Sequence, residues 1–294
     1  MPRISSPSIT LSPSHRDQLL RWTLWGCAST AGLILVFIVV FLVLESIPAL
    51  RHLGVSRFGL DSSWHPGENS YNLVPMAMGT VLSTLGAILL AAPIGLGSAL
   101  FCYWYAPPLM ASLYSRFLEL LAGIPSVVFG FWGLVVLVPL INHWHPPGAS
   151  LLAGVLILAM MILPTTSLLA QSSLAQVPSE YIRGAAALGL GQWATLRHVV
   201  IPAAKSGLWT AALLATGRAL GETMAVLMVC GNVAQMPSTI FDPIRTLTAN
   251  IALEMAYAVD DHRSALFVSG VALLVLILIL VATATWISRT PRHA

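Results

Sequence analysis

Charged residues are scarce in this sequence, and lysine is almost absent. Asp, Glu, Lys and Arg make up 9% of the 294 residues, against roughly a quarter in soluble domains. The only lysine is Lys205, and Val199 and Ala204 replace the glycines of a phosphate-cradling G-x-x-x-x-G-K-[ST] loop. This excludes ATP hydrolysis by that route. The basic residues form no stripe or arm, so the net charge of +3 does not indicate a nucleic-acid partner.

Cysteine is also rare, and the sequence offers no metal site. Cys27, Cys102 and Cys230 lie in apolar runs without metal-ligand spacing, and we interpret them as small packing residues. Histidines such as His143 and His145 have no cysteine or carboxylate at ligand spacing beside them. We also find no nucleophile elbow, zinc helix or paired carboxylates. The sequence therefore predicts no metal site and no bound cofactor, and it does not indicate an enzyme.

Long apolar segments dominate instead, since 57% of the residues are hydrophobic. A helix that crosses the hydrocarbon core needs about 20 such residues. The first segment is longer than a signal-peptide core and has no cleavage pattern after it, so we expect it to be retained. The sequence predicts an all-α integral membrane protein with six transmembrane helices, at 22–44, 75–104, 117–141, 151–170, 207–232 and 265–287.

The basic residues between these segments predict the orientation. Nine of them fall on one side of the membrane and four on the other, and the side richer in Lys and Arg faces the cytoplasm. Segments 1–21, 171–206 and 289–294 are then cytoplasmic, and 45–74 is a periplasmic loop. Both termini are therefore predicted to be cytoplasmic. The nine are Arg3, Arg16, Arg21, Arg116, Arg183, Arg197, Lys205, Arg289 and Arg292; the four are Arg51, Arg57, Arg245 and Arg263.

Arg218 and Glu222 are the strongest functional signal, because no other charge lies between Leu208 and Gly231. Placing an ionisable side chain at bilayer depth costs at least ~2.5 kcal/mol, so such groups normally face a pathway or each other. In one continuous helix the two residues would share a face. A guanidinium suits an oxyanion. Glu222 would then neutralise Arg218 or pair with a partner subunit, while a purely structural ion pair remains the alternative.

Other polar residues are weaker candidates. Thr223 follows the charged pair and is a candidate pathway residue, although a threonine at this depth often bonds its own backbone. Asp242, Arg245 and Glu254 fall on the predicted external side, where they are candidate contacts for a binding protein or an ordinary solvated loop. For 45–72 the sequence predicts no more than a short external cap.

The cytoplasmic segment 171–206 is the second functional signal. Small residues precede a glycine break at Gly189, and an amphipathic stretch then runs to Pro202. This pattern predicts a short helix, a tight turn and a second helix, a shape that can dock in a partner's groove. The alternative is an ordinary surface loop.

This segment resembles the signature of permease subunits of binding-protein-dependent ABC importers, which reads E-A-A, three residues, Gly, then I-x-L-P. Aligned on Gly189 and Pro202, the alanine pair falls on Gly184 and Ala185, and Arg183 replaces the glutamate. Glu180 lies one turn earlier. Three further segments, Leu121–Gly133, Arg218–Val226 and Phe241–Glu254, are similar to the PstC-type permeases of phosphate importers, and the likeness runs from about Leu73 to the end.

The resemblance implies a type I ABC importer transmembrane fold with a permease core over 75–288. It also implies a PstA-type sister permease, a PstB-type ATPase dimer that uses the ATP and a PstS-type periplasmic binding protein that delivers phosphate, in the bacterial inner membrane. The coupling residues would be Glu180, Arg183, Gly184, Ala185, Gly189 and Pro202. The alternatives are a permease for molybdate or sulfate, a stand-alone proton-coupled anion transporter and a membrane sensor or scaffold.

Overall fold

The computed structural model describes residues 15–289, and the chain forms two units, one up to Glu45 and one from Ser46 onward. The first unit is the long N-terminal part of α1 (His15–His52). Its large apolar side chains are exposed, with Trp22 at 76% and Phe37 at 68%. A helix that is apolar all round is suited to a lipid environment. The predicted segments before residue 15 and after residue 289, with Arg3 and Arg292, lie outside the described residues.

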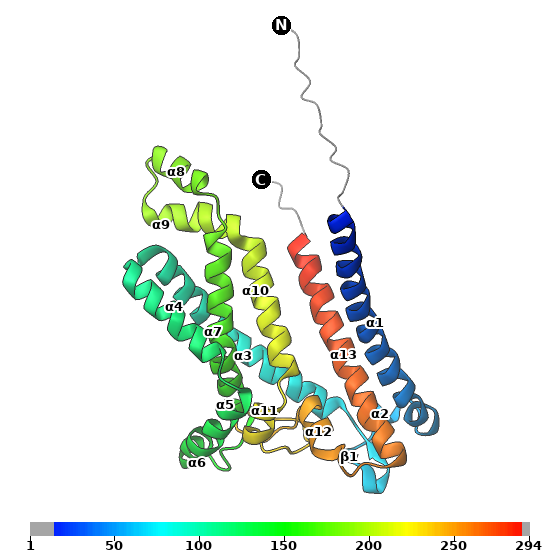
Figure 1. The fold of residues 1–294 in the computed structure, drawn as a ribbon. Helices are drawn as coiled ribbons and strands as arrows, with labels where there is room; N and C mark the ends of the chain where they lie inside the picture. Colours follow the sequence, from blue (N-terminus) through cyan, green and yellow to red (C-terminus); the bar gives the residue numbers. More distant parts are fainter. Residues whose placement is uncertain (1–14, 290–294) are drawn as a thin grey trace. The chain divides into compact units, whose positions relative to one another are not determined.

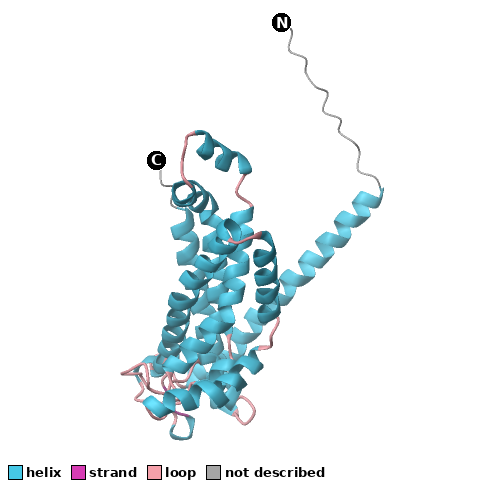
Figure 2. Ribbon diagram, turned by 90° about the vertical axis from the view of Figure 1, so that its left-hand side faces the viewer, coloured by secondary structure: helices cyan, strands magenta, loops and turns pink. Residues whose placement is uncertain are grey.

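The second unit is almost entirely helical (Figures 1 and 2). Its elements in chain order are α2 (Arg57–Leu60), β1 (Trp64–His65), the 3₁₀ turn η1 (Pro66–Glu68), β2 (Ser70–Tyr71), α3 (Val74–Leu100), the π-helical turn η2 (Phe101–Tyr105), α4 (Pro108–Ala122), α5 (Ser126–Trp132), the π-helical turn η3 (Gly133–Leu137), α6 (Val138–Trp144), α7 (Leu151–Ala175), α8 (Ser179–Ala187), α9 (Gln192–Thr195), the π-helical turn η4 (Leu196–Val200), α10 (Ile201–Gly221), α11 (Met224–Val229), α12 (Leu247–Glu254) and α13 (Asp260–Arg289).

Six helical stretches within the described residues are long and apolar enough to cross a membrane, which confirms the all-α fold with six spans. They are Asp17–His52, Val74–Tyr105, Ser126–Trp144, Leu151–Ala175, Gln192–Gly221 and Asp260–Thr283. Two predicted segments differ from single helices. The segment 117–141 is interrupted between Ala122 and Ser126, and 207–232 is interrupted after Gly221. Pro125 accounts for the first break, because proline disfavours helical backbone in the residue before it.

The core of the second unit lies around α7, which packs against α3 and α10. Ile157, Met161 and Ile162 of α7 are fully or almost fully buried beside Ala91 of α3 and Ala215 of α10. Alanine at these positions lets the helices approach closely. Small residues are the usual means of packing helices inside a membrane, where burial in lipid gives no driving force for association.

Two π-helical turns, η3 and η4, come directly before prolines. Pro139 and Pro202 each stand at the second residue of the helix that follows the turn. Proline has no N–H and its ring crowds the carbonyl four residues earlier. A wider turn at this point relieves the crowding without ending the helix.

A small hairpin forms the cap that the sequence left undefined. Strands β1 and β2 pair antiparallel, with Trp64 opposite Tyr71 and His65 opposite Ser70. Trp64 and Tyr71 are buried in a cluster with Leu247 of α12 and Leu266 of α13. The hairpin therefore packs on these helices through its aromatic side chains. β1, α12 and α6 lie at one end of the second unit, and α8 and α9 lie at the other (Figure 1).

Candidate functional site

Arg218 lies in the last turn of α10, where the fifth span is interrupted. The helix ends at Gly221, and Glu222 has extended backbone with φ −68° and ψ 129°. α11 then begins at Met224. Glu222 is the C-terminal capping residue of α10, so the chain leaves the helix immediately after the position one turn beyond Arg218.

The contact of Arg218 is a hydroxyl group and not a carboxylate. Nη1 of Arg218 donates to Oγ1 of Thr165 on α7 at 2.9 Å. The ion pairs within 4.0 Å between described side chains include His52–Asp261, Arg245–Glu254 and His262–Glu254, and Arg218 forms none with a described side chain. The expected neutralisation of Arg218 by Glu222 is absent from this structure. Among the described residues, the half-buried guanidinium therefore has no carboxylate oxygen within 4.0 Å.

Glu222 instead stabilises the interruption. Its Oε1 accepts a hydrogen bond from the backbone N–H of Ala225 at 3.1 Å, in the first turn of α11. That N–H would otherwise lack a partner within the helix. The carbonyl oxygen of Glu222 accepts from the hydroxyl of Thr248 at 2.9 Å. The Thr223 hydroxyl donates to the carbonyl of Gly221 at 3.2 Å, as expected for a threonine that bonds local backbone.

The predicted helix, turn and helix of the segment 171–206 are confirmed by α8, Gly189 and α9. Gly189 has φ +75°, which is readily available to glycine. The N–H of Gly189 donates to Ala186 O at 3.0 Å, and the N–H of Leu190 donates to Ala185 O at 3.0 Å. This pair of bonds is a Schellman motif, so the glycine ends α8 and turns the chain toward α9.

The surface of this turn is exposed and mixed in character. Glu180 and Arg183 project from α8 into solvent, while Ala185 is buried against the rest of the unit. Leu188 is 81% exposed and Trp193 is 62% exposed. Pro202 lies in the first turn of α10 and links the segment directly to the helix that carries Arg218. Exposed leucine and tryptophan around a rigid turn are suited to packing against another protein.

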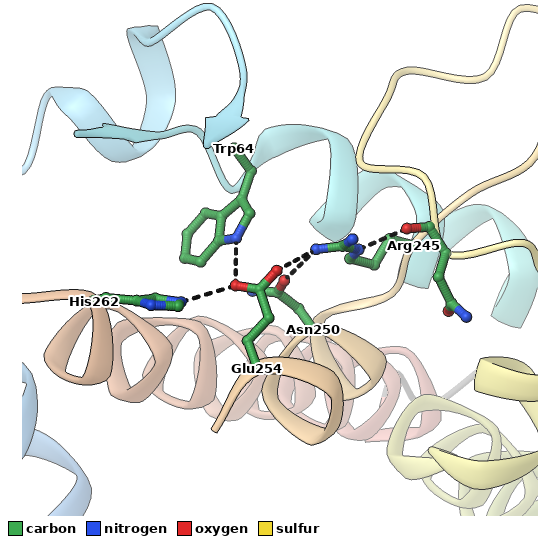
Figure 3. A network of polar contacts seen from close by, with 6 residues as sticks. Trp64, Arg245, Asn250, Glu254 and His262 are labelled. Atoms are coloured by element: carbon green, nitrogen blue, oxygen red, sulfur yellow. Dashed lines mark hydrogen bonds and ion pairs between the residues drawn. The ribbon is translucent and has the colours of Figure 1, made fainter. Parts of the chain in front are cut away.

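At the opposite end of the unit, Glu254 is the centre of a buried polar network (Figure 3). Oε1 of Glu254 lies 2.6 Å from Nη1 of Arg245, and Oε2 accepts from the indole N–H of Trp64 at 2.9 Å. His262 Nε2 lies 2.9 Å from the same Oε2. Arg245 also donates to the side-chain oxygen of Asn250 at 3.1 Å.

These contacts give Arg245 and Glu254 an internal role. Their side chains are only 18% and 8% exposed, so little of either faces a partner. The sequence did not indicate that Trp64 and His262 are neighbours of Glu254. Trp64 stands 190 residues before Glu254 in the chain, and no local pattern connects the two positions.

Asp242 has a local role in the same external region. Its Oδ2 accepts backbone N–H bonds from Ser238 at 2.6 Å and Thr239 at 2.8 Å, and its Oδ1 accepts from the Thr239 hydroxyl at 2.9 Å. These donors, with the backbone N–H of Thr239 the strongest, lower the pKa of the Asp242 carboxyl from its ordinary value of 3.8. Asp242 therefore orders its own loop as a carboxylate.

No cluster of three or more potential metal ligands occurs within residues 15–289. Cys102 and Cys230 are buried free thiols and Cys27 is an exposed one. Burial of Cys102 and Cys230 agrees with their interpretation as packing residues, whereas Cys27 lies on the exposed surface of α1.

Comparison with known proteins places this arrangement in a family. The family described as binding-protein-dependent transport system inner membrane component matches residues 91–293. The probable ABC transporter permease protein YqgH of Bacillus subtilis (strain 168) is 37% identical over 264 residues, which cover 87% of this chain and 85% of that protein. The phosphate transport system permease protein PstC of Mesorhizobium japonicum is 34% identical over 304 residues, 93% of each chain.

Solved structures show the same fold at low sequence identity. A bacterial ABC transporter involved in the import of the acidic polysaccharide alginate has a TM-score of 0.66 at 13% identity, over 94% of this chain and 98% of that one. The inward-facing MetNI methionine ABC transporter has a TM-score of 0.59 at 18% identity, over 74% and 94%. The type I ABC importer transmembrane fold expected from the sequence is therefore confirmed.

Proposed function

The chain belongs to the family of binding-protein-dependent transport system inner membrane components, and from this we propose that it is the PstC-type permease subunit of an ATP-driven phosphate importer. Relatives described as phosphate transport system permease proteins match most of the chain in several bacteria, including Haemophilus influenzae at 31% identity over 91% of this chain. The chain is a multi-pass membrane permease subunit.

The hydrogen bonding of Arg218 is the observation that supports phosphate as the substrate. Placing a guanidinium in a membrane span costs free energy, so such a group normally lines a pathway or has a partner of opposite charge. Here the guanidinium bonds only a neutral hydroxyl, on Thr165. An oxyanion such as phosphate offers the charge that the described carboxylates do not supply, and the planar fork of donors fits its oxygens. Arg218 is therefore our primary phosphate contact.

Glu222 and Thr223 have a different role in this proposal. They hold the interruption of the fifth span through Ala225 N–H, Thr248 and the Gly221 carbonyl. Interrupted helices beside a transport pathway expose backbone polar groups to a cavity and not to lipid. Both residues would thus form the pathway wall beside Arg218. Pairing of Glu222 across the interface with the sister permease remains compatible with this position.

The turn between α8 and α9 is the proposed docking element for a PstB-type ATPase dimer. Its exposed leucine and tryptophan surround Gly189, and Glu180 and Arg183 flank them. Arg183 stands where the family signature has glutamate, so we expect Glu180 to supply the carboxylate contact. ATP would be used by the ATPase, and this chain would bind no cofactor.

The remaining partners follow from the same family. A PstA-type sister permease would complete the pathway, and a PstS-type binding protein would deliver phosphate at the end of the unit that carries β1 and α12. The predicted orientation puts both chain termini in the cytoplasm of a bacterium, with the chain in the inner membrane. In support, α8 and the last described turn of α13 point to the same end of the second unit (Figure 1).

Reconstitution tests this function. The chain is purified with candidate sister permease and ATPase, placed in vesicles, and assayed for uptake of phosphate, sulfate and molybdate with the binding protein. We expect phosphate uptake that requires both ATP and the binding protein. Uptake of sulfate or molybdate in preference to phosphate would overturn the assignment of phosphate as the substrate. Uptake by this chain alone, driven by a proton gradient, would overturn the ABC mechanism.

A further inference from the structure

Two adjacent threonines on α7 differ in how they use their hydroxyl groups. Thr166 donates to the carbonyl of Ile162 at 2.8 Å, the ordinary back-bond of a threonine in a helix. Thr165 instead accepts from the guanidinium of Arg218 at 2.9 Å. Of these two threonines, only Thr165 therefore connects α7 to Arg218 of α10.

The hydroxyl of Thr165 also has a proton that it can still donate. A hydroxyl has one proton to donate and two lone pairs to accept with. The lone pair toward Arg218 is used, and among the described residues we find no hydrogen-bond acceptor for the proton of Thr165. Thr165 is half-buried, so its hydroxyl is not sealed in the core. The O–H can rotate toward a group that arrives beside Arg218.

An oxyanion bound to Arg218 would be such a group. Its oxygens accept hydrogen bonds, and charge-assisted bonds from a guanidinium place them about 2.7 to 2.9 Å from the nitrogen. The Thr165 oxygen lies 2.9 Å from Nη1 of Arg218, so an anion held by the guanidinium would be next to the hydroxyl. Both groups would then donate to the same ligand.

We propose that Thr165 is a second substrate-contacting residue, which orients the Arg218 guanidinium when the pathway is empty and donates its hydroxyl proton to the oxyanion when substrate is present. This inference rests on the proposed role of Arg218. This arrangement favours transport because Arg218 has a neutral hydrogen-bond partner when no substrate is bound. An entering anion does not have to displace a carboxylate or approach one bound to the same guanidinium.

The chain offers well-matched variants for a test. Thr165→Val removes the hydroxyl and keeps the branched shape, and Thr165→Ser keeps the hydroxyl and removes a methyl group. Thr166→Val removes the neighbouring hydroxyl, which serves only the helix backbone. Each variant is assembled into the full complex and assayed for phosphate uptake per ATP hydrolysed, with saturating phosphate-loaded binding protein. The amount of assembled complex is measured in parallel.

We expect Thr165→Val to lower uptake per ATP about tenfold, the factor for one lost charge-assisted hydrogen bond. Thr165→Ser should recover most of the uptake, and Thr166→Val should stay within about twofold of the parent. Uptake by Thr165→Val equal to the parent would overturn the inference. Equal losses in Thr165→Val and Thr165→Ser would also overturn it, because the methyl group and not the hydroxyl would then matter.

Arg218→Ala separates this inference from the proposed function. Loss of uptake in Arg218→Ala with normal uptake in Thr165→Val would reject the role of Thr165 and leave that of Arg218 standing. Normal uptake in Arg218→Ala would reject the anion site as a whole.

Discussion

The hydroxyl of Thr248 on α12 lies 2.9 Å from the carbonyl oxygen of Glu222, so the interruption of the fifth span is bonded to the short helix that follows it. Thr248 also lies 3.1 Å from the Thr246 hydroxyl, which caps α12 by accepting from Ala249 N–H. The backbone N–H of Leu247 donates to Thr80 on α3. The interruption after α10 is thereby connected through α12 to the core of the unit.

Replacing Thr248 by valine should weaken this connection. The variant Thr248→Val keeps the shape but removes the hydrogen bonds of the Thr248 hydroxyl to the Glu222 carbonyl and to the Thr246 hydroxyl. Each lost hydrogen bond costs about 1 kcal/mol, so we expect a measurable decrease in the thermal transition of the purified chain. Thr210→Val is the control, because the Thr210 hydroxyl bonds only its own helix backbone at Ser206. Equal transitions for the two variants would contradict a structural role for Thr248.

Truncating Glu254 should be more damaging. In Glu254→Ala the largely buried Arg245 loses its carboxylate, and Trp64 and His262 lose an acceptor. Breaking a buried ion pair from one side costs about 3 kcal/mol. The exposed acid Glu68 gives the control variant Glu68→Ala, which should change stability by less than about 0.5 kcal/mol. Denaturation of both variants measures the difference, and similar stabilities would show that the network contributes little.

The turn between α8 and α9 allows a matched glycine comparison. Gly189→Ala puts a side chain at φ +75°, which destabilises the turn by about 1 kcal/mol, although no atom lies within 4 Å of the new methyl group. If the turn docks the ATPase, uptake should fall roughly fivefold. Gly97→Ala is the control, because it adds a methyl group in equally open space on α3 at an ordinary helical φ. Unchanged uptake in Gly189→Ala, or an equal loss in Gly97→Ala, would contradict the account of the turn.

Asp242 predicts a dependence of stability on pH. Its pKa is lower in the folded chain than the ordinary 3.8, because the N–H of Thr239 and its neighbours stabilise the carboxylate. The stabilisation is therefore present above pH 3.8 and is lost as the pH falls through the folded pKa. The difference in melting temperature between the parent and Asp242→Asn should shrink as the pH is lowered below 3.8. A difference that does not change with pH would contradict this role.

The sequence was sufficient where local chemistry decides the structure. Long apolar runs predicted six spans, and the glycine at Gly189 between two helical patterns predicted the turn that the structure contains. Both signals act over a few residues, so no knowledge of distant contacts was needed.

The sequence did not predict contacts between residues that are far apart in the chain. Periodicity suggested that Glu222 could neutralise Arg218, but the Glu222 carboxylate accepts from Ala225 N–H and its carbonyl accepts from Thr248. Thr165, 53 residues before Arg218, gave no signal because in sequence it resembles the back-bonded Thr166 beside it. Trp64 and Glu254 likewise became partners only through tertiary packing.

The unbalanced charge of Arg218 is the basis of the functional account, and phosphate uptake by Arg218→Ala tests it most directly. The variant is assembled into the full complex beside Arg51→Ala, which removes an exposed arginine on the predicted external side. We predict that Arg218→Ala assembles normally but takes up phosphate at the background level, while Arg51→Ala matches the parent. Phosphate uptake by Arg218→Ala at the parental rate would contradict the account.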